Sequence, residues 1–246
     1  MIGEILMEKF NPAFQFIPLI LVRNLCNMEK RNALIAGASG LVGNSLLKQL
    51  LTDDLYENVV VIVRKPLEFK HPKLTQLLVD FDLLDTFEAG MPVDDVFCAL
   101  GTTIKTAGSQ EAFYKVDFTY VVNLGKWCEH TSIQRFLIVS AMGASAKSGI
   151  FYNRVKGEME AAVRQLHIPQ VQVFRPSLLM GNRNEKRGGE KIAQVVMGAL
   201  GFLFVGPLLK YKAIHADVVA GAMIKAAKSG VNGFTVYESG QMQLMV

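Results

Sequence analysis

The chain has 246 residues, of which 50% are hydrophobic and 20% are charged, and its formal net charge is +4. This composition excludes a disordered chain, and the length suits one α/β domain whose core needs no disulfide or metal. The mild positive charge is compatible with a pocket for an anionic cofactor. Because no basic run or zinc-finger motif is present, we predict no nucleic-acid partner.

The three cysteines form no CxxC pair, and the four histidines are widely scattered along the chain. An odd number of cysteines without a disulfide framework is typical of a reduced protein, so we expect a cytoplasmic location. The same scatter predicts no metal site. The cysteines are Cys26, Cys98 and Cys128, and the histidines are His71, His130, His167 and His215.

Two apolar stretches, 16–22 and 195–209, bear on membrane insertion. The first is too short to cross a bilayer and contains Pro18, and the second is interrupted by glycines and by Pro207. We therefore predict no integral membrane insertion.

The pattern of elements begins after Met28, which could be an internal start, and the role of the extension 1–28 is open. A short apolar run at 32–36 is followed by a glycine turn and an amphipathic helix at 44–51. Strands at 59–63, 74–79, 95–100, 136–140 and 171–174 and helices at 110–130 and 152–166 follow. This alternation predicts that 29–246 form a doubly wound parallel sheet, the Rossmann fold. After Arg175 the alternation loosens, which predicts a small C-terminal cap at about 176–212 over the carboxyl edge of the sheet.

The turn at 37–43 has the sequence GASGLVG and stands between the first strand and its helix. Glycines at this spacing allow a tight turn, close approach of a pyrophosphate, and packing of the helix on the strand. The helix start then offers free N–H groups and a positive dipole end to phosphate. The predicted cofactor contacts here are Gly37, Ala38, Ser39, Gly40, Leu41, Val42 and Gly43.

The next strand bears on the identity of the dinucleotide. An NAD enzyme usually places a carboxylate at its end for the ribose 2′-hydroxyl, whereas this chain has Arg64 and Lys65 there. A guanidinium suits a 2′-phosphate, so NADP(H) is favoured over NAD. The alternative is that both cations merely solvate a loop. Asp80 either accepts from the adenine amino group or is a solvated loop carboxylate.

A YxxxK pattern, Tyr152 to Lys156, falls on a predicted helix and puts both side chains on one face. A nearby ammonium helps a tyrosine move a proton to or from a substrate oxygen, and the lysine could also bind the nicotinamide ribose. Ser140 ends the preceding strand, where its hydroxyl could steady a reacting carbonyl.

These motifs carry a resemblance to a known family. From about position 30 to 240 the chain resembles the atypical and extended short-chain dehydrogenases/reductases, and within them it looks most like the Tat-interacting-protein oxidoreductase branch and its bacterial relatives. The narrower resemblance is carried by ALGTT at 99–103, YxxxKGExE at 152–160, FRP at 174–176 and RGGE at 187–190.

The resemblance implies a triad of Ser140, Tyr152 and Lys156, with Tyr152 as proton donor or acceptor. One departure concerns the central helix, where extended relatives often carry Asn and this chain has Asp117, so a water relay there is in doubt. The cofactor contacts that the resemblance implies beyond the glycine turn are Arg64, Lys65, Leu100, Gly101, Leu179 and Arg187. Thr102, Tyr152 and Lys156 are predicted cofactor contacts as well.

The predicted cap combines a basic loop at 182–191 with an apolar stretch at 192–209. The loop could bind a phosphate or an acidic substrate group, or simply be solvated. The apolar stretch could line a substrate pocket, form a homodimer or protein interface, or complete the core.

Three functions compete. The first is an NADPH-dependent reductase acting on a carbonyl-like small molecule, with Tyr152 supplying the proton. The second is an NADP(H)-binding regulator that senses redox state with little turnover. The third, a sugar-nucleotide epimerase or dehydratase, is suggested by the RPxxxxG segment ending at Gly181, but Arg64 and the short tail after Gly181 speak against it.

Overall fold

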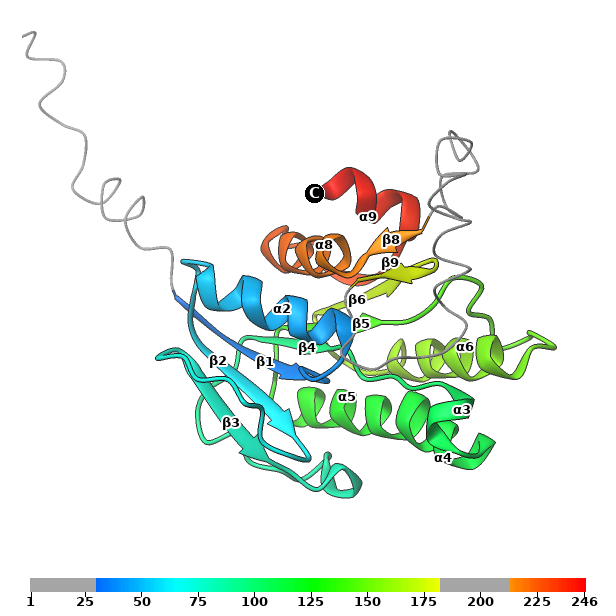
Figure 1. The fold of residues 1–246 in the computed structure, drawn as a ribbon, viewed down its shortest axis with the longest axis horizontal. Coiled ribbons are helices and arrows are strands. Elements are labelled where there is room, and N and C mark those ends of the chain that lie inside the picture. Colours follow the sequence, from blue (N-terminus) through cyan, green and yellow to red (C-terminus); the bar gives the residue numbers. More distant parts are fainter. Residues whose placement is uncertain (1–29, 182–212) are drawn as a thin grey trace, which may run out of the picture. The chain divides into compact units, whose positions relative to one another are not determined.

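The computed structural model describes residues 30–181 and 213–246. Within them the chain forms a seven-stranded sheet in which every neighbouring pair of strands is parallel (Figure 1). The spatial order is β3-β2-β1-β4-β5-β6-β9, which confirms the doubly wound fold predicted from the sequence. The strands are β1 (Arg31–Ala36), β2 (Tyr56–Val63), β3 (Leu74–Leu78), β4 (Asp95–Cys98), β5 (Arg135–Val139), β6 (Gln170–Arg175) and β9 (Gly233–Glu238).

Helices cover both faces of this sheet. On one face lie α2 (Leu41–Thr52) and α8 (Ala216–Lys228), and on the other lie α5 (Tyr120–His130) and α6 (Phe151–Val163) (Figure 1). Shorter elements complete the described chain: α3 (Ile104–Ala107), α4 (Gln110–Tyr114), α9 (Ser239–Met245) and a 3-10 turn at Phe81–Leu83. None of the helices in the described ranges is long and apolar enough to cross a membrane.

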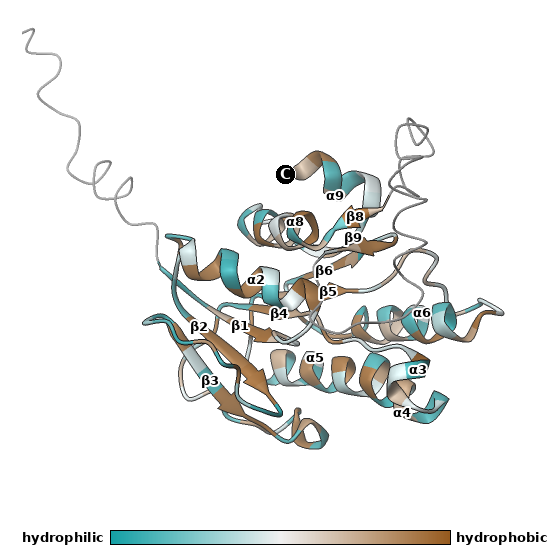
Figure 2. Ribbon diagram, viewed as in Figure 1, coloured by the Kyte–Doolittle hydropathy of each residue, from teal (hydrophilic) through white to brown (hydrophobic). Residues whose placement is uncertain are grey.

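The two cores follow from the alternation of side chains along the strands. In β1, Ala33 and Ile35 face α2 and α8, whereas Leu34 and Ala36 face α5 and α6. All four are fully buried, which explains why this part of the strand is a continuous apolar run in the sequence. Figure 2 shows the same arrangement as hydrophobic central strands between helices that carry both hydrophobic and hydrophilic residues.

The strand order fixes where a ligand can bind. After β1 the chain moves outward to β2 and β3, and then returns to β4 on the other side of β1. Helices that leave two adjacent strands in opposite directions open a crevice at the carboxyl ends of those strands. The register pairs Ala36 with Cys98, so the turn after β1 and the loop after β4 begin side by side at this crevice.

The C-terminal part of the chain corrects one expectation. We expected the alternation to loosen after Arg175, but in the described residues 213–246 it continues through α8 and β9, and β9 pairs with β6. As an edge strand, β9 is only partly buried and therefore shows no continuous apolar run. A small second sheet joins β7 (Leu179–Met180) to β8 (Ile214–His215).

Several expectations fall on residues that the structure does not describe. These are the role of the extension 1–28, the basic loop at 182–191 with Arg187, the apolar stretch at 192–209, and most of the predicted cap.

The helix predicted at 110–130 is present but is not uniform. It consists of α4, a π-helical turn at Lys115–Thr119, and α5. In the π turn the Tyr120 N–H donates to the Lys115 carbonyl, five residues back. Hydrophobic periodicity could not reveal this, because a stretch of five residues is too short for a change of helical period to be recognised.

Candidate active site

The glycine turn after β1 is tightly packed against the loop after β4. Gly37 has a φ of +91°, and a Cβ at this position would come within 2.5 Å of the Ala99 carbonyl oxygen. A Cβ on Gly43 would come within 2.0 Å of the Gly37 carbonyl oxygen. Side chains at either position would therefore force the turn, the loop and the helix apart, which explains the glycines at both ends of the motif.

The start of α2 is open to an anion. Its N-cap is Gly40, no side chain caps it, and its first turn holds no acidic residue. Ser39 and Gly40 are exposed, whereas Ala38 and Val42 are buried and support the turn from inside. Unsatisfied N–H groups and the positive end of the helix dipole would therefore face a phosphate that approached this turn.

Arg64 and Lys65 follow β2 directly and are both exposed. The Arg64 guanidinium carbon lies 6.0 Å from the centroid of the Phe81 ring. In the described residues no carboxylate pairs with either cation. Their charges are thus available to an anionic ligand.

Asp80 has a local partner. Its carboxylate accepts from the Asp82 N–H and caps the 3-10 turn at Phe81–Leu83. The residue is exposed, and its predicted contact with adenine stays a prediction.

The loop after β4 carries three of the predicted contacts. Gly101 is exposed, and Leu100 packs against the core on the α5 and α6 face. The Thr102 N–H donates to Asp117 Oδ2 at 2.8 Å. A Cβ on Gly101 would lie 3.8 Å from Lys156 Nζ, so the catalytic lysine predicted on α6 lies against this loop.

Tyr152 and Lys156 lie one turn apart on α6, as the spacing predicted. Tyr152 is partly buried, and its ring centroid is 5.5 Å from that of Phe113. Lys156 is 3% exposed, and its Nζ is 2.7 Å from Asp117 Oδ1. Burial alone would lower the pKa of Lys156, but the negative charge and hydrogen bond of Asp117, together with Tyr152, raise it above its usual value.

Ser140 follows β5 and is buried, and its hydroxyl donates to Glu160 Oε1. Glu160 also accepts two hydrogen bonds from Arg175, which in turn contacts Glu238 of β9. A hydroxyl has a single proton, so Ser140 could donate to a substrate only after leaving Glu160. Its predicted role toward the substrate carbonyl stays a prediction.

The segment around β7 lies beside the glycine turn. A Cβ on Gly181 would come within 2.7 Å of Leu41 Cδ1 at the start of α2. Leu179 is partly buried and packs against the core on the α2 face. The structure therefore brings this predicted contact to the same end of the sheet as the glycine turn.

Sequence reasoning missed the partners of these residues. Glu160 falls inside the YxxxKGExE run and Arg175 inside FRP, but their ion pair required the fold to bring α6 and β6 together. For Asp117 the sequence only put a water relay in doubt, whereas the structure shows that it contacts Lys156 directly.

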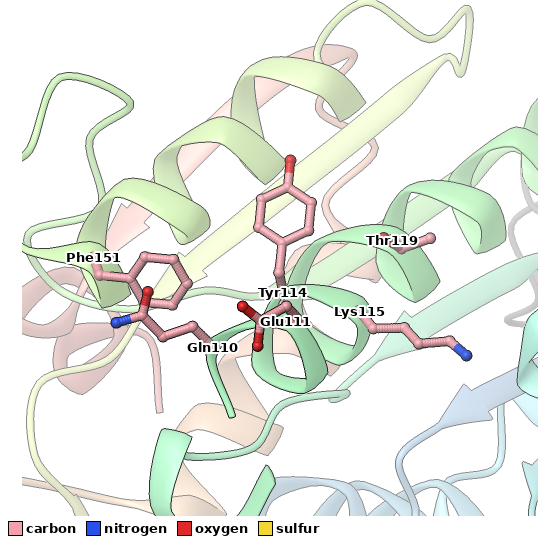
Figure 3. Close-up of a pocket in the computed structure, with 6 residues that line it drawn as sticks. All are labelled: Gln110, Glu111, Tyr114, Lys115, Thr119 and Phe151. Carbon is pink, nitrogen blue, oxygen red and sulfur yellow. The ribbon is translucent and has the colours of Figure 1, made fainter. Parts of the chain in front are cut away.

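A separate shallow pocket of about 370 Å³ lies between α4, the π turn and the start of α6. Figure 3 shows its lining side chains, none of which belongs to the glycine turn or to the predicted triad. We therefore do not assign the cofactor to it. The lining residues are Gln110, Glu111, Tyr114, Lys115, Thr119 and Phe151.

In residues 30–181 and 213–246 no group of three or more His, Cys, Asp or Glu side chains could hold a metal ion. By contrast, the glycine cradle, the open helix start and the crevice between β1 and β4 fit a dinucleotide. Together they define a nucleotide-binding protein of the Rossmann class.

Comparison with known proteins agrees with this class. A family model described as NAD(P)H-binding matches residues 37–179. Over 231 residues the chain is 32% identical to protein HTATIP2 of Rattus norvegicus, covering 92% of this chain and 90% of that protein. Over 213 residues it is 32% identical to the mitochondrial protein fmp52 of Aspergillus clavatus, covering 82% and 89%. The chain thus belongs to the NAD(P)H-binding family that this model describes.

Solved structures share the fold. UDP-glucose 4-epimerase from Thermotoga maritima superposes with a TM-score of 0.65 at 14% identity, over 87% of this chain and 81% of the epimerase. The human epimerase family protein SDR39U1 with NADPH gives a TM-score of 0.56 at 19% identity, over 84% and 74%. At these identities the likeness concerns the fold alone.

Proposed function

We propose that the protein is an NADPH-dependent oxidoreductase that reduces a carbonyl-like group of a small molecule, with Tyr152 as the proton donor. The observation that carries the proposal is the pair of Tyr152 and the buried, charged Lys156 on α6, next to the loop that flanks the glycine turn. The membership in an NAD(P)H-binding family supports the cofactor class.

Each residue has a part in this proposal. The glycine turn and the start of α2 hold the pyrophosphate, and a bound NADPH would supply the hydride. Lys156 keeps a positive charge one turn from Tyr152, which favours transfer of the phenolic proton to a substrate oxygen. Ser140 could join them only by exchanging Glu160 for the substrate.

The choice of NADPH over NADH rests on Arg64 and Lys65. Both are exposed at the end of β2, the strand that in this fold ends beside the adenosine ribose. A guanidinium can bind a 2′-phosphate through paired hydrogen bonds, whereas a strand end without a carboxylate gives a 2′-hydroxyl no acceptor.

Calorimetric titration with NADPH and NADH tests the cofactor assignment. We expect NADPH to bind at least tenfold more tightly, and Arg64→Ala to remove this advantage. Lys70→Ala, which changes another exposed cation of the same loop, serves as the control and should keep it. Equal affinities, or a preference for NADH, would contradict the assignment and would favour the epimerase alternative.

A screen of carbonyl substrates then tests turnover. Loss of the phenolic hydroxyl in Tyr152→Phe should lower kcat by roughly 10²- to 10⁴-fold while NADPH still binds. A variant that keeps full activity would remove Tyr152 from the mechanism.

One observation favours a second candidate, an NADP(H)-binding regulator with little turnover. The Ser140 hydroxyl is engaged with Glu160, so the catalytic set is not assembled in this arrangement. Tight NADPH binding without consumption across the carbonyl screen would support this candidate.

A cytoplasmic location remains part of the proposal. The buried free thiols of Cys98 and Cys128 suit a reducing compartment, but the fungal relatives are named mitochondrial proteins. Fractionation of cells that express the full chain would distinguish the two.

A further inference from the structure

Asp117 lies in the π turn with its side chain fully buried, and its two carboxylate oxygens contact two different parts of the site. Oδ1 is 2.7 Å from Nζ of Lys156 on α6, and Oδ2 accepts from the Thr102 N–H in the loop after β4 at 2.8 Å. One carboxylate therefore joins the lysine to the loop that borders the glycine turn.

The π turn places this carboxylate. Because its hydrogen bond runs from Tyr120 back to Lys115, it holds one more residue than an α turn and re-aims the side chains within it. A Cβ on Gly101 would be 3.4 Å from Asp117 Oδ1, so the carboxylate lies directly under the loop.

We propose that Asp117 is a positioning residue that keeps Lys156 charged in its buried position and fixes it to the loop after β4. This inference rests on the proposed function only for its effect on turnover. Its effect on the charge of Lys156 belongs to the cofactor-free protein.

The electrostatics of Lys156 agree with this role. The groups that face its ammonium are Asp117 from the π turn, Tyr152 from its own helix and Cys98 from β4. Among them Asp117 is the one carboxylate. Burial would lower the pKa of Lys156, and the charge and hydrogen bond of Asp117 reverse that tendency.

An asparagine could not replace the carboxylate. Both partners are donors, and an amide has only one oxygen, so in either orientation its NH₂ group would meet a donor. A glutamate keeps both the charge and the two acceptors. Asp117→Asn and Asp117→Glu therefore form a matched pair.

The first test measures the free energy of unfolding against pH in the cofactor-free protein. In the wild type, the stability that Lys156 contributes is present below pH 10.5 and is lost above it, because its pKa in the folded protein lies above the ordinary lysine value of 10.5. In Asp117→Asn the buried lysine loses its partner, so its folded pKa should fall below the unfolded value. The free energy of unfolding of this variant should then fall below that of the wild type by the largest amount near pH 7. This deficit in the free energy of unfolding should shrink as the pH rises toward about 10.

Adding Lys156→Met to Asp117→Asn removes the stranded ammonium, so the pH-dependent part of the deficit should disappear. If Asp117→Asn fails to fold, folding of the double variant would support the proposal, and failure of both would contradict it. A deficit that is the same at every pH, with or without Lys156, would overturn it.

The second test uses turnover. Asp117→Asn should move the alkaline limit of carbonyl reduction to lower pH by about one unit, and Asp117→Glu should restore it. An unchanged pH profile in an active Asp117→Asn variant would contradict the proposal. If the wild type binds NADPH without turnover, the proposed function fails, while the stability measurements still decide the role of Asp117.

Discussion

The hydroxyl of Ser140 donates its only proton to the carboxylate of Glu160, a residue of α6, where this helix packs against the sheet. Arg175 holds the same carboxylate through two hydrogen bonds and extends the cluster to Glu238. Ser140 thus belongs to a charged cluster that links α6, β6 and β9. The sequence predicted that this serine acts on the substrate, so its hydrogen bond to Glu160 calls for a direct test.

Ser140→Ala separates the two uses of the hydroxyl. Loss of a buried hydrogen bond to a charged acceptor should lower the free energy of unfolding by about 1–3 kcal/mol. Because the hydroxyl is already engaged, we expect kcat/KM to fall by less than tenfold. Chemical denaturation and steady-state kinetics give the two values. A fall of several hundredfold in kcat with unchanged stability would show that the hydroxyl leaves Glu160 when substrate binds.

Two glycines of the turn should respond differently to the same added methyl group. A Cβ on Gly43 would overlap the Gly37 carbonyl at 2.0 Å, so Gly43→Ala should cost about 1–3 kcal/mol or more in unfolding free energy. At Gly40 the nearest atom is 3.3 Å away, and the site is exposed. We therefore expect Gly40→Ala to fold nearly normally but to bind NADPH at least tenfold more weakly. Normal affinity in Gly40→Ala would place the pyrophosphate elsewhere.

The two described cysteines should be inert in the folded protein. Burial raises the pKa of the Cys98 thiol to about 12, and it raises that of Cys128 well above its usual value. In a Cys26→Ser variant at pH 8, a thiol reagent should react with neither cysteine until the chain is unfolded. A rapid reaction with the folded variant would contradict this burial.

These thiols also affect stability at alkaline pH. They remain protonated in the folded state, whereas in the unfolded chain they ionise near pH 9. Their contribution is therefore complete below pH 9 and should be lost as the pH rises toward about 12. Replacing Cys98 with Ala should reduce this alkaline loss, which a pH series of denaturation curves would measure.

Tyr56 and Asp95 belong to a second buried cluster, at the end of the sheet opposite the glycine turn. The Tyr56 hydroxyl donates to Asp95 at 2.6 Å, and Arg31 and Arg135 pair with the same carboxylate. Tyr56→Phe leaves those two cations in place, so we expect a loss of about 1–3 kcal/mol in unfolding free energy without a change in NADPH affinity. A change in affinity would link this cluster to the site.

The sequence was sufficient to predict the fold because its signals were local. An apolar run before GASGLVG predicted β1, the turn and α2, and the Tyr152 and Lys156 spacing predicted one helix face. The π turn and the contact of Asp117 with Lys156 were not predictable, because a five-residue stretch is too short for a change of helical period to be recognised in the apolar pattern. The partner of Ser140 depends on how α6 packs against the sheet, and β9 was missed because an edge strand is only partly buried.

The position of β9 beside β6 bears on the order in which the chain can fold during synthesis. The open edge of β6 is covered only when residues beyond 232 are available. Helix α8 also contacts α2 and its C-terminal end, since Asp217 of α8 binds Ser45 of α2 and Lys228 pairs with Asp53. These contacts can therefore close only after residues 217–238 have left the ribosome, and contacts so distant in sequence are associated with slow folding. Until then the unpaired edge of β6 would be open to pairing with a second chain.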